Sequence, residues 1–329
     1  MTMHPHKSLI NWLYLSAFMV FAMAVIGAIT RLTESGLSMV EWRPLIGTLP
    51  PLSEAEWTRV FTLYQESPEY QKINIGMSLN EFKTIFFWEW FHRVWGRLIG
   101  VVYALPLIYF WVKNKIPKGY KPKLLIGLLL GGSQGLMGWY MVQSGLIDRP
   151  SVSHFRLAAH LSLAAIIFCY LLWLAFSLKN NPAEKTSFCL KRHGWIAFSL
   201  TFITLIWGAY VAGLNAGLLY NTWPMMGGHW IPTELTSISS ILFDPAAVQF
   251  FHRWIAIVTG LAVLTFAIRI QSISLAGMVL LQIGLGISTL ISQVWTPLAA
   301  LHQAGAFILL ALLIYNLNQL HNTSYDCKA

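Results

Sequence analysis

Four histidines stand inside long apolar segments of this 329-residue chain, and we list them as His92, His160, His252 and His302. Ionisable side chains are rare in membrane-spanning segments and generally mark function there. Two imidazoles facing each other across a helical bundle at equal depth provide the axial ligands of a low-spin haem. Imidazole also binds copper or zinc, but zinc needs further ligands, and cysteine and carboxylate are scarce nearby. Helix–helix hydrogen bonding is the alternative without a metal, and the set of four favours haem.

Residues that recur at intervals of three and four share one face of a helix, and two such faces surround His92 and His252. The faces consist of Glu89, His92, Arg93, Gly96, Arg97 and Gly100, and of Gln249, His252, Arg253, Ala256, Ile257 and Gly260. Small residues on both faces leave room for a flat macrocycle. Arg93 and Arg253 are expected near the membrane surface, where a guanidinium pairs with a haem propionate or reaches the lipid headgroups.

The composition requires lipid as the solvent for most of the chain. The sequence is 56% hydrophobic and 11% charged, whereas soluble domains carry about 25% charged residues. A helix needs about 20 apolar residues to cross a bilayer. Eight segments meet this requirement, so we predict an all-α integral membrane protein. The predicted helices cover about 10–30, 86–111, 124–143, 155–178, 194–213, 247–269, 274–293 and 297–317.

The net charge is +9, and the positions of the basic residues indicate the topology of the chain. The basic residues lie in short segments that fall on one side if the helices alternate, and this side is predicted to be cytoplasmic. They are Lys7, Lys113, Lys115, Lys118, Lys121, Lys123, Lys179, Lys185, Lys191, Arg192, Arg269 and Lys328. Both termini are then cytoplasmic, segments 31–85 and 214–246 lie outside, and nucleic-acid binding is excluded.

The short N-terminus lacks an Arg- and Ser-rich transit peptide, which favours a bacterial inner (plasma) membrane. The outer segments contain no cysteine, so no disulfide framework is expected there. Six other histidines fall in termini, loops or helix ends, where we expect solvated positions. These are His4, His6, His154, His193, His229 and His321.

The sequence contains a duplicated four-helix unit, which divides the chain into residues 1–180 and 181–329. The matched landmarks occur in the same order in both halves. They are Gly27-Ala28 and Gly208-Ala209, Trp42 and Trp223, Pro44 and Pro224, Phe91-His92-Arg93 and Phe251-His252-Arg253, and Ala159-His160 and Leu301-His302. Because each half has an even number of helices, we expect two four-helix bundles related by a pseudo-twofold axis along the membrane normal.

The two halves differ in their ionisable residues. Glu89 is matched by Gln249, Arg97 by Ile257, and Arg156, one turn before His160, by Leu298. A pocket that performs proton chemistry needs a titratable group, whereas a pocket that only holds a cofactor does not. The asymmetry favours a reactive site in the first half and an electron-transfer site in the second. The alternative is that Glu89 only pairs with Arg93 at i+4.

Several long motifs resemble the haem A synthase family, and the resemblance covers essentially the whole chain. They are G-A-I-T-R-L-T-E-S-G-L-S-M at 27–39, W-R-P-L-I-G-T-L-P-P at 42–51, E-W-F-H-R at 89–93, N-T-W-P-M-M-G at 221–227 and F-F-H-R-W at 250–254. Some members carry a cysteine pair in the outer loops. This chain resembles the cysteine-free branch found in proteobacteria and mitochondria.

The resemblance implies an oxidoreductase for cytochrome oxidase biogenesis that converts the ring methyl of haem O to the formyl of haem A by successive hydroxylations. It implies that His92 and His160 flank the substrate haem iron, and that His252 and His302 ligate a permanent haem b. Glu89 would be the essential carboxylate. Arg93, Arg97 and Arg156 are then expected on the substrate side and Arg253 on the cofactor side.

The implied partners are haem O, the haem O synthase that supplies it, membrane lipid and an unidentified electron acceptor. A homo-oligomer stays open. The main rival is a di-haem b-type electron-transfer protein, which needs the four histidines but not Glu89. A transporter is a weaker rival, because the polar faces lie on unbroken helices. The outer segment 52–85 contains Ser53-Glu54-Ala55-Glu56-Trp57, whose N-cap and acidic first turn predict a short interfacial helix. As a separate hypothesis, this segment covers the substrate pocket.

Overall fold

The structure, a computed structural model, describes residues 6–41, 46–145, 152–179, 188–235 and 241–321. This part of the chain contains eight helices long and apolar enough to cross a membrane and no β-strand. They are α1 (Lys7–Leu32), α4 (Leu79–Val112), α5 (Tyr120–Gly145), α6 (His154–Lys179), α7 (Phe188–Gly213), α8 (Pro245–Arg269), α9 (Ile273–Ile291) and α10 (Thr296–His321). The predicted all-α fold and its eight spanning segments are confirmed.

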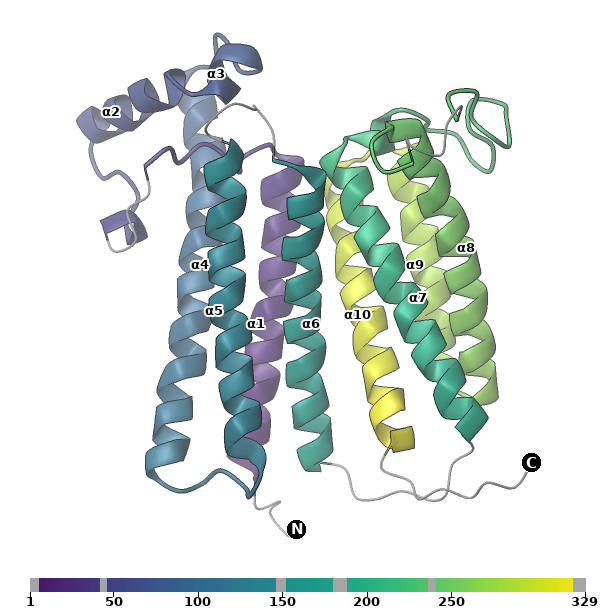
Figure 1. Cartoon of the computed structure of the whole chain (residues 1–329). Coiled ribbons are helices and arrows are strands. Elements are labelled where there is room, and N and C mark those ends of the chain that lie inside the picture. The colour runs from purple at the N-terminus through teal and green to yellow at the C-terminus, as the bar shows by residue number, and fades with distance from the viewer. Residues whose placement is uncertain (1–5, 42–45, 146–151, 180–187, 236–240, 322–329) are drawn as a thin grey trace.

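The spanning helices stand side by side in two groups of four (Figure 1). Helices α1, α4, α5 and α6 pack on one another, as do α7, α8, α9 and α10, and the groups meet where α1 and α6 contact α7 and α10. The start of α1 and the end of α10 lie at the same end of the molecule (Figure 1). The pseudo-twofold axis and the two-domain division stay predictions.

The peripheral helices expose apolar side chains along their length. Leu105 of α4, Leu129 of α5, Leu261 of α8 and Leu280 of α9 are all exposed. In water this surface would be costly, whereas lipid tails accept it. The molecule is a multi-pass membrane protein with its most buried helices, α1 and α6, at the centre.

Polar bonds and an aromatic contact join the two groups. The Gln303 amide of α10 donates to the Ala24 carbonyl of α1 at 2.6 Å. At the end of α1, Arg31 donates to the Ala212 carbonyl at 2.9 Å and to Asn215 Oδ1 at 2.9 Å. The rings of Phe168 of α6 and Phe307 of α10 also meet, with centroids 5.3 Å apart.

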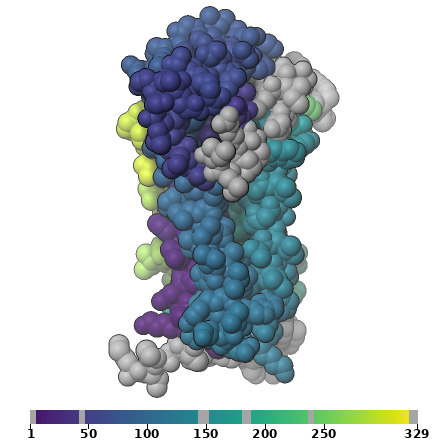
Figure 2. Space-filling model, turned by 90° about the vertical axis from the view of Figure 1, so that its left-hand side faces the viewer, coloured from purple at the N-terminus to yellow at the C-terminus, as the bar shows by residue number. Residues whose placement is uncertain are grey.

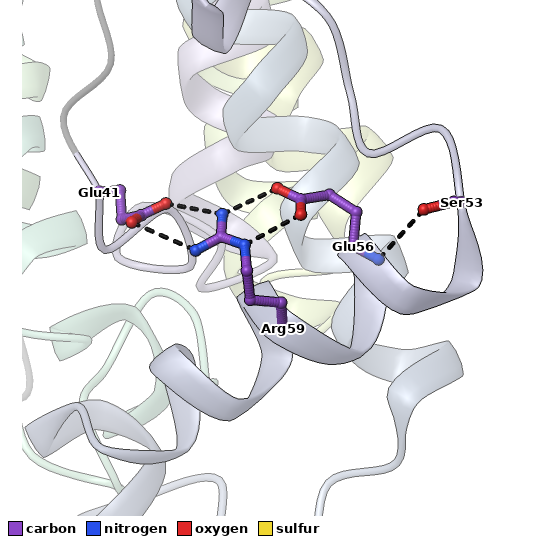
Figure 3. Close-up of polar contacts among 4 residues, drawn as sticks. All are labelled: Glu41, Ser53, Glu56 and Arg59. Atoms are coloured by element: carbon purple, nitrogen blue, oxygen red, sulfur yellow. Dashed lines mark hydrogen bonds and ion pairs between the residues drawn. The ribbon is translucent and has the colours of Figure 1, made fainter.

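A compact cap, formed by α2 (Glu54–Gln65) and α3 (Pro68–Lys72), covers one end of α4 (Figures 1 and 2). The Ser53 hydroxyl accepts from the Glu56 amide at 3.2 Å, so the predicted N-capped helix is confirmed. Arg59 then bridges Glu41 and Glu56 through donor–acceptor distances of 2.8 to 3.3 Å (Figure 3). These groups are partly exposed, so the ion pairs orient α2 more than they stabilise it.

Helix α4 begins at Leu79, seven residues before the expected start at 86. The extra turns start at a capping box, in which the Ser78 hydroxyl accepts from the Glu81 amide and the Glu81 carboxylate accepts from the Ser78 amide. Phe82 and Phe86 of these turns pack with Tyr64 of α2 in a core of their own. Hydropathy alone missed these turns because their apolar face meets the cap rather than lipid.

The expectation of solvated positions is wrong for His154 and His193. The His154 ring donates to the Leu242 carbonyl at 2.9 Å. His193 donates to the Ala262 carbonyl at 3.1 Å and accepts from Arg269 at 3.1 Å. Both rings turn toward a neighbouring element, which their positions near helix ends did not reveal. The predictions for Trp42, Pro44, Lys185 and Lys328, together with His4, fall outside the described residues.

The close contact between the end of α7 and the start of α6 depends on Gly213. A methyl group at this position would lie 2.7 Å from the backbone Cα of His154. We expect Gly213→Ala to destabilise the protein by about 1 to 3 kcal/mol, because the backbone must move to admit the methyl group. The measurement is the midpoint of thermal unfolding in detergent micelles.

Gly277 of α9 provides the matched control, since a methyl group there meets nothing within 4 Å. Gly277→Ala should leave stability unchanged or raise it by up to about 1 kcal/mol, because alanine favours helix more than glycine does. Equal midpoints for the two variants would contradict the close contact between Gly213 and His154.

Candidate functional site

One cavity of about 2400 Å³ runs between the spanning helices, and all four membrane histidines line it. His92 of α4 lies near enough to His160 of α6 to interact electrostatically, and His252 of α8 interacts with His302 of α10 in the same way. The structure therefore brings the histidines together as one pair in each half of the chain. Glu89, Arg93, Arg97 and Arg253 also line the cavity.

Each histidine ring packs against a glycine of a neighbouring helix. A methyl group built on the glycine would lie only 2.8 to 3.3 Å from the nearest ring atom. The pairs are Gly27 with His92, Gly138 with His160, Gly208 with His252, and Gly286 with His302. Any larger residue would push the ring from its place, so these glycines determine where the imidazoles stand.

Two glutamines that our sequence reasoning missed hold the α6 and α10 histidines from behind. The Gln134 amide donates to the His160 carbonyl at 3.2 Å, and its Nε2 lies 3.3 Å from the ring Nε2. The Gln282 amide donates to the His302 carbonyl at 2.9 Å, and its Nε2 lies 3.2 Å from the ring Nδ1. Both glutamines lie four residues before a ring-packing glycine. The repeat Gln-x-x-x-Gly was the signal that could have identified them.

The histidine pairs suit a metal with two axial protein ligands. The Nδ1 atoms of His160 and His252 are buried without a hydrogen-bond partner, which is unusual for a buried polar atom. Across the described ranges, no group of three or more His, Cys, Asp or Glu side chains could hold a metal ion. A zinc site of the common kind would need three or four such ligands, so the donor set fits haem iron better.

Glu89 is almost fully buried and fixes the segment that follows α1. Its carboxylate accepts from the Ser38 hydroxyl at 2.7 Å and from the Met39 amide at 2.8 Å. It also forms an ion pair with Arg93, which donates a further bond to the Met39 carbonyl at 3.2 Å. The i+4 pair that we considered as the alternative role of Glu89 does form. The same carboxylate nevertheless lines the cavity.

Gln249 anchors the segment that follows α7 in the second half, but it donates a hydrogen bond where Glu89 accepts hydrogen bonds. Its amide donates to the Tyr220 carbonyl at 3.1 Å. Arg253 donates to the same carbonyl at 2.9 Å and to the Thr222 carbonyl at 2.9 Å. The segment after α7 thus presents acceptors, whereas the segment after α1 presents two donors. An amide suits the first environment and a carboxylate the second.

The arginines that distinguish the first half lie in different places. Arg97 lines the cavity, and Ile257 lines it at the matched position. Arg156 is not among the lining residues. Its guanidinium lies over the ring of Tyr140, 4.4 Å from the centroid, in a cation–π contact between α6 and α5.

Glu69 of the cap is a lining residue that the sequence did not reveal. Its side chain is 5% exposed and forms part of the cavity wall with Ile73. The Tyr64 hydroxyl donates to Glu69 Oε2 at 3.1 Å, and the Asn74 amide donates to the Tyr64 hydroxyl at 2.7 Å. Burial raises the pKa of the Glu69 carboxyl to about 8.

The fold and the site define a class: multi-pass α-helical membrane proteins with paired histidines around an internal cavity. Residues 10–314 match a family described as cytochrome oxidase assembly protein, and the chain belongs to that family. Its relatives include the haem A synthases of Rhodospirillum centenum, Nitrosospira multiformis and Paramagnetospirillum magneticum. They are 50%, 45% and 44% identical to it, over 95%, 92% and 96% of this chain and 88%, 90% and 94% of their own.

Substitution of Ser38 tests how its hydroxyl and the Glu89 carboxylate anchor the segment after α1. Ser38→Ala removes one donor from a buried carboxylate, and hydrogen bonds to charged groups contribute about 1.5 to 3 kcal/mol. We expect the free energy of unfolding to fall by this amount and backbone amide hydrogen exchange in residues 33–41 to become faster. Ser133→Ala is the control, because Ser133 is exposed and bonds only to its own helix. Unchanged exchange after Ser38→Ala would contradict the anchoring of this segment by Glu89.

Proposed function

We propose that this protein is a haem A synthase, which oxidises the ring methyl of haem O to the formyl group of haem A by successive hydroxylations. The observation that carries the proposal is that a histidine pair and a buried carboxylate, Glu89, line the same cavity. Relatives of the chain that align with it over nearly their whole length bear the name haem A synthase. This activity places the enzyme among the oxidoreductases and in cytochrome oxidase biogenesis.

His92 and His160 are the residues that would hold the substrate haem O in the first half. Gly27 and Gly138 leave their rings unobstructed, and Arg93 and Arg97 provide cations for the haem propionates. Arg156 supports this pocket indirectly in the proposal, since its contact with Tyr140 braces α6 against α5. Residues 1–180 would then form the substrate half.

His252 and His302 are the residues that would hold haem b in residues 181–329, with Arg253 near its propionates. The buried, unpartnered His252 Nδ1 and the glycines beside both rings support this assignment. When bound, haem b supplies one-electron redox chemistry. The neutral residues Gln249 and Ile257 suit a pocket that holds a cofactor without exchanging protons with it.

Glu89 is the proposed proton-handling residue of the substrate half. Each oxidation of the methyl carbon removes two electrons, which leave through the redox-active haems to the electron acceptor, and releases two protons. A carboxylate near the reacting carbon can accept such a proton, and carboxylates perform this task in buried sites. The bonds from Ser38 and Met39 and the ion pair with Arg93 fix the carboxylate at the cavity wall.

The topology proposed is a bacterial inner membrane protein with both termini in the cytoplasm. Lysines concentrate at the end of the molecule where α1 begins and α10 ends, including Lys113, Lys115 and Lys118 between α4 and α5 and Lys121 in the first turn of α5, which supports that orientation. The proposed partners are the haem O synthase, as supplier of the substrate, and an electron acceptor. The rival di-haem electron carrier is not favoured, because it would have no use for a cavity-lining carboxylate.

Substitution of Glu89 tests the chemistry. Cells that supply haem O would express wild-type and Glu89→Gln protein, and extracted haems would be identified by chromatography and mass. We expect haem A or its hydroxymethyl intermediate in wild type. The variant should retain haem b, accumulate haem O and turn over at least about 100-fold more slowly, since general acid–base groups contribute 10² to 10⁴ in rate.

Glu54→Gln is the control for Glu89→Gln, because Glu54 is exposed and pairs only with Lys83 at the surface. Haem b alone in wild type and in Glu89→Gln, at two per chain, would refute the synthase and support the electron carrier.

Removal of one ligand from each pair tests the assignment of the halves. His92→Ala should lose haem O and keep haem b, whereas His252→Ala should lose haem b and keep haem O, because each haem depends on its own pair of axial ligands. The measurement is the haem content of each purified variant, with the absorption spectrum of the reduced protein. Loss of both haems from both variants, in protein that still elutes as folded, would contradict separate sites.

A further inference from the structure

We propose that Glu69 exchanges protons between the cavity and the water at the surface of the cap during haem O oxidation. The inference rests on the proposed function and adds a second proton-carrying residue to it. In this step a proton moves between the Glu89 and Glu69 carboxyl groups, directly or through water in the cavity, and between Glu69 and bulk water. No electron moves and no covalent bond other than O–H is made or broken.

The first argument is the position of Glu69. It belongs to α3, outside the spanning helices, yet it lines the same cavity as Glu89. Ile73, one turn further along, is 50% exposed, and Glu66 of the preceding turn is exposed. Glu69 therefore lies at the cavity wall between exposed residues of the cap.

The second argument is the set of groups that face Glu69. Burial raises its pKa to about 8, the Tyr64 hydrogen bond lowers it, the charges of Glu89 and Glu34 raise it, and Arg31 lowers it. These groups come from α2, α4 and the end of α1. Both protonation states are then populated near neutral pH, which is the condition for efficient proton transfer. Glu89 is thus one of the charges that raise the pKa of Glu69, after burial.

The third argument is that packing alone does not require a carboxyl group here. Tyr64 is fully buried and needs an acceptor for its hydroxyl, and a neutral amide oxygen would serve this purpose without the cost of burying an ionisable group. An ionisable side chain at this position is therefore better explained by proton exchange than by the anchoring of Tyr64.

The test measures the rate of haem A formation per mole of haem b in membrane fragments that contain haem O, from about pH 7 to about pH 9. In wild type we expect a change of rate with a midpoint near pH 8. Glu69→Gln keeps an acceptor for Tyr64, so the protein should fold and retain its haems. Its rate should nevertheless fall at least about tenfold, and the transition should disappear. Glu69→Asp should restore the transition.

Two further variants separate proton exchange from a structural role. Tyr64→Phe removes the hydrogen bond that lowers the pKa of Glu69, so the midpoint should move to higher pH. Glu66→Gln makes the same substitution on an exposed neighbour, and rate and midpoint should match wild type.

A Glu69→Gln variant with the wild-type rate and the wild-type transition would overturn the inference. So would a variant that loses protein yield while its turnover per haem b and its transition persist, because that result assigns Glu69 to packing. Wild-type fragments that form no haem A would contradict the proposed function, and the inference would fall with it. Haem A formation that is insensitive to Glu69→Gln would refute the inference alone.

Discussion

A bilayer offers no hydrogen-bonding partner at its centre, so a histidine in a spanning helix needs both space and a partner within the protein. The structure provides the space four times by placing a glycine opposite each imidazole. The glycines permit close helix approach, as small residues generally do in membranes. The glutamines Gln134 and Gln282 then hold the α6 and α10 histidines by backbone carbonyl and ring together. This arrangement determines where the imidazoles stand at the cavity wall.

The same constraint governs the segments that close the cavity, because extended backbone near the membrane must find partners for its amides and carbonyls. The segment after α1 turns donors inward and meets Glu89, and the segment after α7 turns carbonyls inward and meets Gln249. The difference between the halves thus has a structural reason beside the chemical one. The carboxylate that anchors this segment also lines the cavity, which is the position that its proposed role in proton transfer requires.

The sequence predicted features that depend on composition along one helix. Hydropathy located all eight spans, and the spacing around His92 and His252 identified the faces that line the cavity. Features that depend on contacts between distant segments were not predictable. The start of α4 at Leu79 depends on packing against Tyr64, and Glu69 resembles any surface glutamate until α3 is folded over the cavity. The expectation that His154 is solvated was wrong for the same reason, because its ring bonds to the distant Leu242 carbonyl.

The cap links contacts between distant segments to the residues that line the cavity. Its aromatic core fixes α2 on the extension of α4, and the Ser78 capping box holds that extension in helical form. Because α4 also carries Glu89 and His92, any movement of the cap must act on the residues of the cavity through one continuous helix. Tyr64 of this core donates a hydrogen bond to Glu69, so the core also holds this side chain at the cavity wall. Burial at a fixed distance from water is what makes a carboxyl group useful for proton exchange, and the folded cap provides it.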